Sequence, residues 1–202
     1  KAIDAGYSLI IVLTGMQNLL RKQTQRRLDM EVVGVANILR DLPEYQAAGT
    51  PQGEYLDDEE WESGFSRLLD QNALPRVMRL TSYNHDVVKQ SYSNMMFPAY
   101  SSSDAYLDGM DKEEVRLVIT KKNASVLKKL NDAIRYNQKA LSNVPTLLID
   151  DESDQATPNT EKPNFVDPEL QKHKKINSQI IEMMSMLDRC QYVGYTATPL
   201  PM

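Results

Sequence analysis

The chain has 202 residues, 41% of them apolar and 25% charged, which is enough for one α/β domain with a buried core and too little for two typical domains. Its net charge of −5 means that contact with nucleic acid would depend on a local basic patch and not on the overall field. A single cysteine excludes an internal disulfide framework, and the lack of CxxC and HExxH patterns argues against zinc sites. No apolar run approaches the length of a membrane span, about 18 residues, which predicts a soluble, cytoplasmic protein.

The first elements of the chain are a turn, a strand and a helix. Residues 1–5 followed by Gly6 have the pattern of the last turns of a helix closed by a glycine. Because no initiator methionine precedes them, we expect the chain to be part of a longer protein. The β-branched apolar run at 9–13 then predicts a strand, and a helix follows whose apolar stripe contains Leu20 and Leu28.

The middle of the chain contains a long irregular segment and two more strands. Residues 41–64 are rich in proline, glycine and acidic side chains and predict a loop or insertion. Short apolar runs at 77–80 and 115–120 have the length and β-branched content of strands. The next helix has an apolar stripe formed by Leu127, Leu130 and Ile134.

The last part repeats the alternation of strand and helix. Apolar runs at 146–149 and 192–195 predict strands, and a second loop is expected at 154–166. The helix between them can be capped by Asp167 and has Pro168 at its first position. Its apolar stripe consists of Ile176, Ile180, Met184 and Leu187. Near-continuous apolar strands separated by helices predict an α/β fold whose parallel sheet is buried on both faces.

A run of carboxylates follows the strand at 146–149, in the order Asp150, Asp151, Glu152 and Asp154. An apolar strand that ends in acids places them where ligands bind in open α/β sheets. In nucleotide hydrolysis the first acid holds magnesium and the next orients or deprotonates the attacking water, and Asp151 and Glu152 would take these roles. The alternative interpretation is an acidic turn that caps the following helix.

Two hydroxyl residues follow the last predicted strand. Thr196 and Thr198 flank an alanine, and their hydroxyls would hydrogen-bond the acidic segment if the two strands are neighbours. The D-E-x-D at one strand end and the T-A-T at the next resemble motifs II and III of superfamily 2 helicases. In that family five strands follow the phosphate-loop strand in the order predicted here. The resemblance implies a RecA-like P-loop NTPase domain over residues 1–202, a three-layer sandwich with a mostly parallel sheet, truncated on its N-terminal side and lacking the phosphate-loop strand.

Three longer segments make the resemblance more specific. They are residues 11–28, with IVLTGM and LRKQTQRRL, residues 149–156, with IDDESDQA, and residues 194–199, with GYTATP. They resemble the Z-one domain, a helicase-like ATPase module that carries an endonuclease label and occurs in bacterial DNA restriction or repair proteins. The resemblance implies ATP and Mg²⁺ as cofactors, hydrolysis through Asp151 and Glu152, and Asp151 as the metal ligand. It also implies that coupling to DNA runs through Asp154, Gln155, Thr196 and Thr198.

Basic residues after two strands predict contacts with the DNA backbone. Helical spacing puts Arg21, Lys22 and Arg26 on the side away from Leu20 and Leu28, where they could follow phosphates. The alternative is an ordinary solvated helix face. By resemblance, this helix follows motif Ia and a second contact segment is motif Ib; the matching residues are Gly15 in the first and Thr120, Lys121 and Lys122 in the second.

The sequence also departs from the family. It contains no GxxxxGK[ST] pattern, and a phosphate loop cradles the nucleotide and supplies the lysine that screens its charge. We therefore expect this chain alone to bind ATP weakly and to be inactive. The phosphate loop and a second RecA-like domain with its arginine finger would belong to the same parent chain. Since the phosphate-loop strand is internal in such sheets, its loss is expected to expose apolar surface.

These observations favour part of a DNA-dependent ATPase or helicase-like motor in a bacterial DNA restriction, defence or repair protein. One alternative is a magnesium-dependent endonuclease domain. Restriction-type nucleases pair an acid at one strand with an acid-x-lysine pattern at the next, and neither 150–154 nor 113–116 supplies that lysine. A second alternative is a helicase-like scaffold that binds partners without catalysis.

Overall fold

A computed structural model of the chain describes residues 1–34, 55, 77–87, 115–153 and 168–196, with side chains in the last segment from residue 174 onward. The predicted loops at 41–64 and 154–166 lie outside these residues, apart from Tyr55. Within the described segments no helix is both long and apolar enough to cross a membrane.

The described strands form one parallel sheet with the order β2-β3-β1-β4-β5. They are β1 (Leu9–Thr14), β2 (Val77–Arg79), β3 (Val115–Lys121), β4 (Thr146–Asp151) and β5 (Cys190–Tyr195). All five strands predicted from apolar runs are confirmed, and their bounds differ from the prediction by one or two residues. The central strand β1 is buried along its whole length, which is why its sequence is apolar without interruption.

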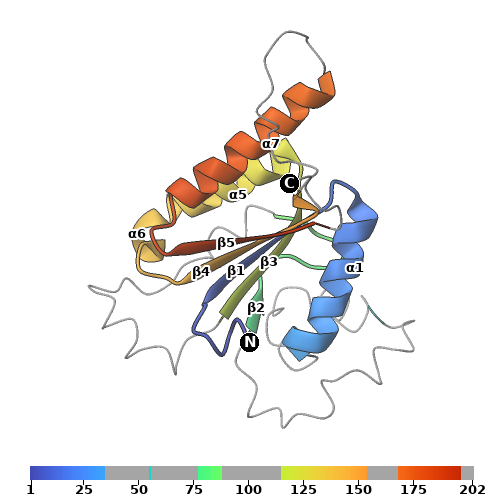
Figure 1. Cartoon of the computed structure of the whole chain (residues 1–202). Helices are drawn as coiled ribbons and strands as arrows, with labels where there is room; N and C mark the ends of the chain where they lie inside the picture. The colour runs from blue at the N-terminus through green and yellow to red at the C-terminus, as the bar shows by residue number, and fades with distance from the viewer. Residues whose placement is uncertain (35–54, 56–76, 88–114, 154–167, 197–202) are drawn as a thin grey trace.

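Helices cover both faces of this sheet (Figure 1). They are α1 (Asn18–Leu28), the π-helix η1 (Asp29–Val33), α5 (Ala124–Tyr136), α6 (Gln138–Leu141) and α7 (Pro168–Ser185). On one face, α5 and α7 pack against each other and on Leu9, Ile11 and Leu13 of β1. On the other face, next to α1, Val33 of η1 belongs to the same cluster as Ile10. The predicted α/β fold with helices on both sides of a parallel sheet is therefore confirmed.

The residues before β1 form a single turn. The Ala5 N–H donates to the carbonyl of Lys1 at 3.0 Å, which is the hydrogen-bond spacing of an α-helical turn. Gly6 has a φ of 88°, a left-handed value that glycine adopts without strain. The predicted glycine at the end of a helical turn is confirmed, and it redirects the chain into the central strand.

The predicted apolar stripe of α5 and the predicted start of α7 at Pro168 are confirmed, while Asp167, the predicted cap of α7, lies outside the described residues. The side chain of Asn123 caps α5 by accepting the Ser125 N–H at 3.0 Å, and the predicted apolar stripe of α5 is fully buried. Helix α7 begins at Pro168, as its missing N–H favours. In its stripe, however, Met183 is buried and Met184 is exposed. The prediction for Met184 is wrong because the i, i+4, i+7 spacing from Ile176 continues through Met183.

Helix α1 turns a polar stripe toward the sheet. Its buried residues are Arg21 and Gln25, and the buried Asp29 follows at the start of η1. Leu20 and Leu28, which carried the predicted apolar stripe, are only partly buried. Arg21 therefore lies neither on the predicted surface that would follow DNA phosphates nor on the alternative solvated face, and both interpretations are wrong for this residue.

Hydrogen bonds explain how this polar stripe can be buried. The Asp29 carboxylate accepts from Arg79 Nη1 at 2.6 Å, from the Tyr55 hydroxyl at 2.5 Å and from Gln25 Nε2 at 2.9 Å. The Thr81 hydroxyl in turn donates to Gln25 Oε1 at 2.9 Å. Burial raises the pKa of Asp29, and the positive charge of Arg79 opposes that shift. The network joins α1, η1 and the end of β2 through hydrogen-bonded polar groups, in addition to the apolar packing of Val33.

Strand β5 forms one edge of the sheet and none of its residues is fully buried. Tyr192 is 38% exposed and Tyr195 is 59% exposed. The prediction that this strand is buried on both faces is therefore wrong. Because Thr146 N–H donates to the carbonyl of Arg189 at 2.9 Å, the backbone groups of the even-numbered β5 residues point away from β4. Among the described residues, no further strand pairs with this partly aromatic edge.

Candidate functional site

The carboxyl ends of β1 and β4 lie side by side, and the chain leaves them toward opposite faces. β1 leads into α1 on one face, whereas α7, the helix after β4, lies on the other face (Figure 1). Where neighbouring parallel strands part in this way, a crevice forms outside their carboxyl ends, and open α/β proteins bind ligands there. Gly15 follows β1 at this point and Glu152 follows β4. A Cβ atom added to Gly15 would lie only 2.3 Å from Glu152 Oε2, so the two strand ends meet closely.

Glu152 occupies a strained turn at the end of β4. Its φ of 56° is in the left-handed region, which for a residue other than glycine typically costs about 1–3 kcal/mol. Its N–H donates to Asp151 Oδ1 at 3.1 Å, while Asp151 itself is exposed to solvent. Glu152 Oε2 is buried and accepts no hydrogen bond from the described residues. The turn therefore places a buried carboxylate oxygen with unused acceptor capacity at the carboxyl ends of β1 and β4.

The buried side chain of Lys122 donates hydrogen bonds to the backbone of this turn. Lys122 Nζ lies 2.9 Å from Asp150 Oδ1 and donates to the carbonyls of Asp151 at 2.7 Å and Glu152 at 2.5 Å. The Tyr192 hydroxyl donates to the other Asp150 oxygen at 2.8 Å, and burial together with this bond raises the pKa of Tyr192. Lys122 follows β3, so its side chain must pass the end of β1 to reach β4. Both charges of the pair are almost completely removed from solvent.

The loop after β2 is fastened to the same edge by two predicted site residues. Arg21 donates to the carbonyls of Ser82 at 2.9 Å and Tyr83 at 2.7 Å. The Thr120 hydroxyl donates to Asp86 Oδ1 at 2.7 Å. Arg21 and Thr120 are both buried, so they anchor a loop and do not lie on an open surface.

Three of the predicted DNA-contact residues keep part of their side chains accessible. Lys22 and Arg26 on α1, and Lys121 at the end of β3, are each partly exposed. Lys22 Nζ lies 4.6 Å from the centre of the Tyr83 ring, a cation–π contact, and Lys121 Nζ donates to an asparagine side chain of α1 at 2.6 Å. A nucleic-acid contact at this edge would depend on these three side chains, because the other basic candidates are buried.

The carboxylates at the crevice suit magnesium held together with phosphate. Mg²⁺ is usually bound through one or two carboxylates, with phosphate oxygens and water completing its shell. The exposed carboxylate of Asp151 and the unused oxygen of Glu152 provide donors of this kind. Within the segments that the structure describes, no three His, Cys, Asp or Glu residues gather into a dedicated metal centre.

The predicted proximity of the two strand ends is confirmed. β4 and β5 are paired in parallel, with Asp151 opposite Tyr195, and Thr196 follows as an exposed residue. A coupling role for Thr196 remains a prediction. The other predicted coupling residues, Asp154, Gln155 and Thr198, lie outside the described residues.

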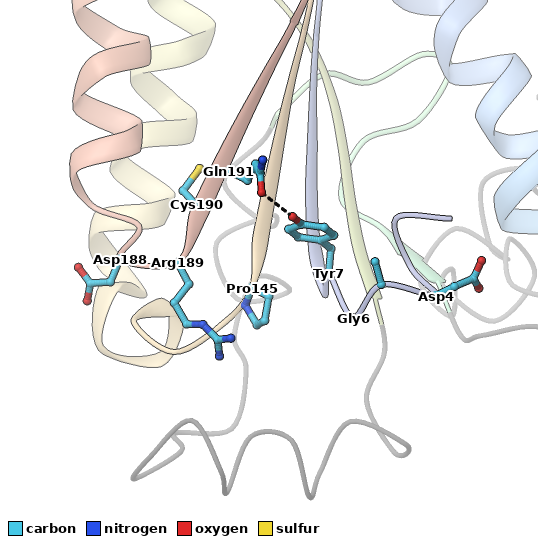
Figure 2. A pocket seen from close by; sticks show the side chains of 9 residues that line it. Asp4, Gly6, Tyr7, Pro145, Asp188, Arg189, Cys190 and Gln191 are labelled. Atoms are coloured by element: carbon cyan, nitrogen blue, oxygen red, sulfur yellow. Dashed lines mark hydrogen bonds between the residues drawn. The ribbon is translucent and has the colours of Figure 1, made fainter.

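A shallow cavity of about 490 Å³ lies at the opposite, amino edge of the sheet. Figure 2 shows Tyr7 and Gln191 pointing toward one another there, and the Tyr7 hydroxyl donates to Gln191 Oε1 at 3.0 Å. Asp4, Arg189 and Cys190 also line the cavity. Burial raises the pKa of the Cys190 thiol, which disfavours its reactive thiolate form. This cavity contains none of the predicted site residues, so the carboxyl edge is the candidate functional site.

Sequence reasoning did not anticipate the buried pair of Lys122 and Asp150, to which the Tyr192 hydroxyl donates, because it placed Lys122 on a surface. One signal was present: Asp150 continues an apolar strand, and a buried carboxylate needs a cation or strong hydrogen bonds. Which lysine supplies the charge depends on strand order, which local sequence does not contain. Comparison of the chain with protein-family models, curated proteins and solved structures found no match.

Proposed function

We propose that this chain is part of a DNA-dependent ATPase motor of the superfamily 2 helicase type, with a RecA-like domain similar to the Z-one domain, acting in bacterial DNA restriction, defence or repair. The observation that carries the proposal is the carboxylate of Glu152. It is delivered by a buried parallel strand to the crevice between β1 and β4, and its buried oxygen has no partner among the described residues.

Two neighbouring acids support hydrolysis as the reaction. In this proposal Asp151 is the ligand of Mg²⁺, which when bound with ATP would screen the charge of the phosphates. Glu152 then orients the attacking water and accepts its proton, because its Oε2 retains free acceptor capacity. The close approach of Gly15 limits the space around that oxygen.

The full-length protein would supply the parts that this sequence lacks. The chain has no GxxxxGK[ST] pattern, so the phosphate loop and the arginine finger of a second RecA-like domain are proposed to come from elsewhere in the same protein. The open edge of β5 supports this arrangement, because its outward backbone groups can pair with a further strand. DNA would contact the side chains of Lys22, Arg26 and Lys121.

The test is ATP turnover of the full-length protein, with and without DNA, for the wild type and Glu152→Gln. The substitution keeps the size of the side chain and removes its basicity, so we expect turnover to fall by about 10²–10⁴-fold while the fold persists. Glu31→Gln is the matched control, because Glu31 is exposed and forms an ion pair with Arg27 on the helix surface. Wild-type turnover in Glu152→Gln would refute the assigned role.

A further inference from the structure

We propose that Lys122 is a positioning residue for the reaction at this site: its buried ammonium group fixes the turn that carries Asp151 and Glu152. The inference rests on the proposed function. It assigns Lys122 no contact with nucleotide or DNA, which distinguishes it from the predicted surface role. Asp150 and Tyr192 complete the group by holding the ammonium in place.

Three oxygen atoms around Lys122 Nζ restrict the position of the ammonium group. The ammonium group donates to two backbone carbonyls, those of Asp151 and Glu152, and forms an ion pair with Asp150 Oδ1 at 2.9 Å. Its side chain is fully buried, so no solvent can replace a partner that moves away. Any displacement of Nζ therefore displaces the carbonyls of Asp151 and Glu152 with it.

These two carbonyls determine the conformation of Glu152. The carbonyl of Asp151 belongs to the peptide group before Glu152, and the carbonyl of Glu152 belongs to the peptide group after it. Holding both peptide groups fixes φ and ψ of Glu152 together. Its left-handed φ of 56° is otherwise unfavourable and persists only where the surroundings constrain it. Lys122 supplies that constraint and so directs the Glu152 carboxylate toward Gly15.

Asp150 has a different role from the two carbonyls, because its carboxylate neutralises the positive charge of Lys122. A buried ammonium without a counter-charge would be strongly destabilising, and the Asp150 carboxylate compensates it. The second oxygen of Asp150 is occupied by the Tyr192 hydroxyl, which keeps the carboxylate oriented. Because the two tasks use different partners, substitutions can separate them. Removing both charges restores electrical balance but leaves the two carbonyls without their donor.

The experiment compares Lys122→Met, Asp150→Asn and the double variant in the full-length protein, measuring thermal unfolding together with kcat and KM for ATP. We expect Lys122→Met to lose stability and the double variant to regain most of it. The double variant should nevertheless keep a kcat about tenfold or more below wild type, with KM changed by less than about twofold. Lys129→Met, an exposed lysine on α5, should leave both constants unchanged. A double variant with wild-type kcat would overturn the proposal, because Lys122 would then only balance charge.

Amide hydrogen exchange separates this proposal from the ATPase proposal. If the wild type hydrolyses no ATP with or without DNA, the proposed function fails, but the turn can still be followed. The amides of Glu152 and Ser153 should then exchange about tenfold or more faster in the double variant than in wild type or Lys129→Met, because the turn opens more often. Unchanged exchange at both amides would show that Lys122 does not hold the turn.

Discussion

Replacing Gly15 by alanine should impair the site without unfolding the protein. The added Cβ would lie 2.3 Å from Glu152 Oε2 and 2.8 Å from Leu20 Cδ1, whereas ordinary contacts begin at 3.4 Å. Both neighbours are ends of flexible side chains, so rotation can relieve the clash at a cost of about 1 kcal/mol or less. The Glu152 carboxylate must then retreat by about 1 Å. A misplacement of that size at a reacting group lowers the rate by about 100-fold.

The assay for Gly15→Ala is ATP turnover of the full-length protein at saturating ATP, with a urea denaturation curve measured on the same preparation. We expect kcat to fall by about 100-fold while the urea midpoint stays near that of wild type. Lys129→Ala is the control, because Lys129 is exposed on α5. Full turnover in Gly15→Ala would show that the position of the Glu152 carboxylate does not govern the reaction.

Two further predictions concern stability and DNA. Arg79→Met leaves the Asp29 carboxylate buried without its cation, which should cost about 3–5 kcal/mol near neutral pH. Burial already raises the pKa of Asp29 above 3.8, and loss of Arg79 raises it further. Since a raised pKa in the folded state lowers stability as pH rises, the variant's deficit in unfolding free energy relative to wild type should grow as pH rises from the raised pKa of Asp29 in the wild type to its higher pKa in the variant; a deficit that stays constant at every pH above 3.8 would contradict this. Lys22→Glu combined with Lys121→Glu should weaken DNA binding and reduce the slope of log K against log salt by about 0.9 for each lost phosphate contact. Lys129→Glu is the control, and an unchanged slope in the double variant would remove these two lysines from the DNA contact.

The internal strands were predictable because their burial on both faces produces continuous apolar runs in the sequence. A strand inside a parallel sheet contacts helices on both faces, so β1, β3 and β4 are apolar at almost every position. The acids at the end of β4 were predictable in part: Asp151 marks the point where the buried strand reaches solvent, whereas Asp150 is buried. The helices α5 and α7 followed from their apolar spacing.

The features that were missed depend on partners distant in sequence. The stripe of Arg21, Gln25 and Asp29 appears solvated by pattern alone, but Arg79 and Tyr55 come from other parts of the chain and satisfy Asp29 inside the core. The exposure of β5 could not be deduced from its composition, because an edge strand and an internal strand can share the same apolar run. The ion pair between Lys122 and Asp150 likewise could not be deduced, because it depends on strand order.

The edge position of β5 also determines how local stability is distributed across the sheet. β5 is hydrogen-bonded to one neighbouring strand and has no fully buried side chain, so opening it breaks one ladder and exposes little additional apolar surface. Opening β1 would break two ladders and expose six buried residues. Elements with a low free energy of opening are the ones that move when a protein changes state. The segment leading to Thr196 can therefore shift or detach as a unit, while the central strand that leads to Gly15 remains a fixed reference for it.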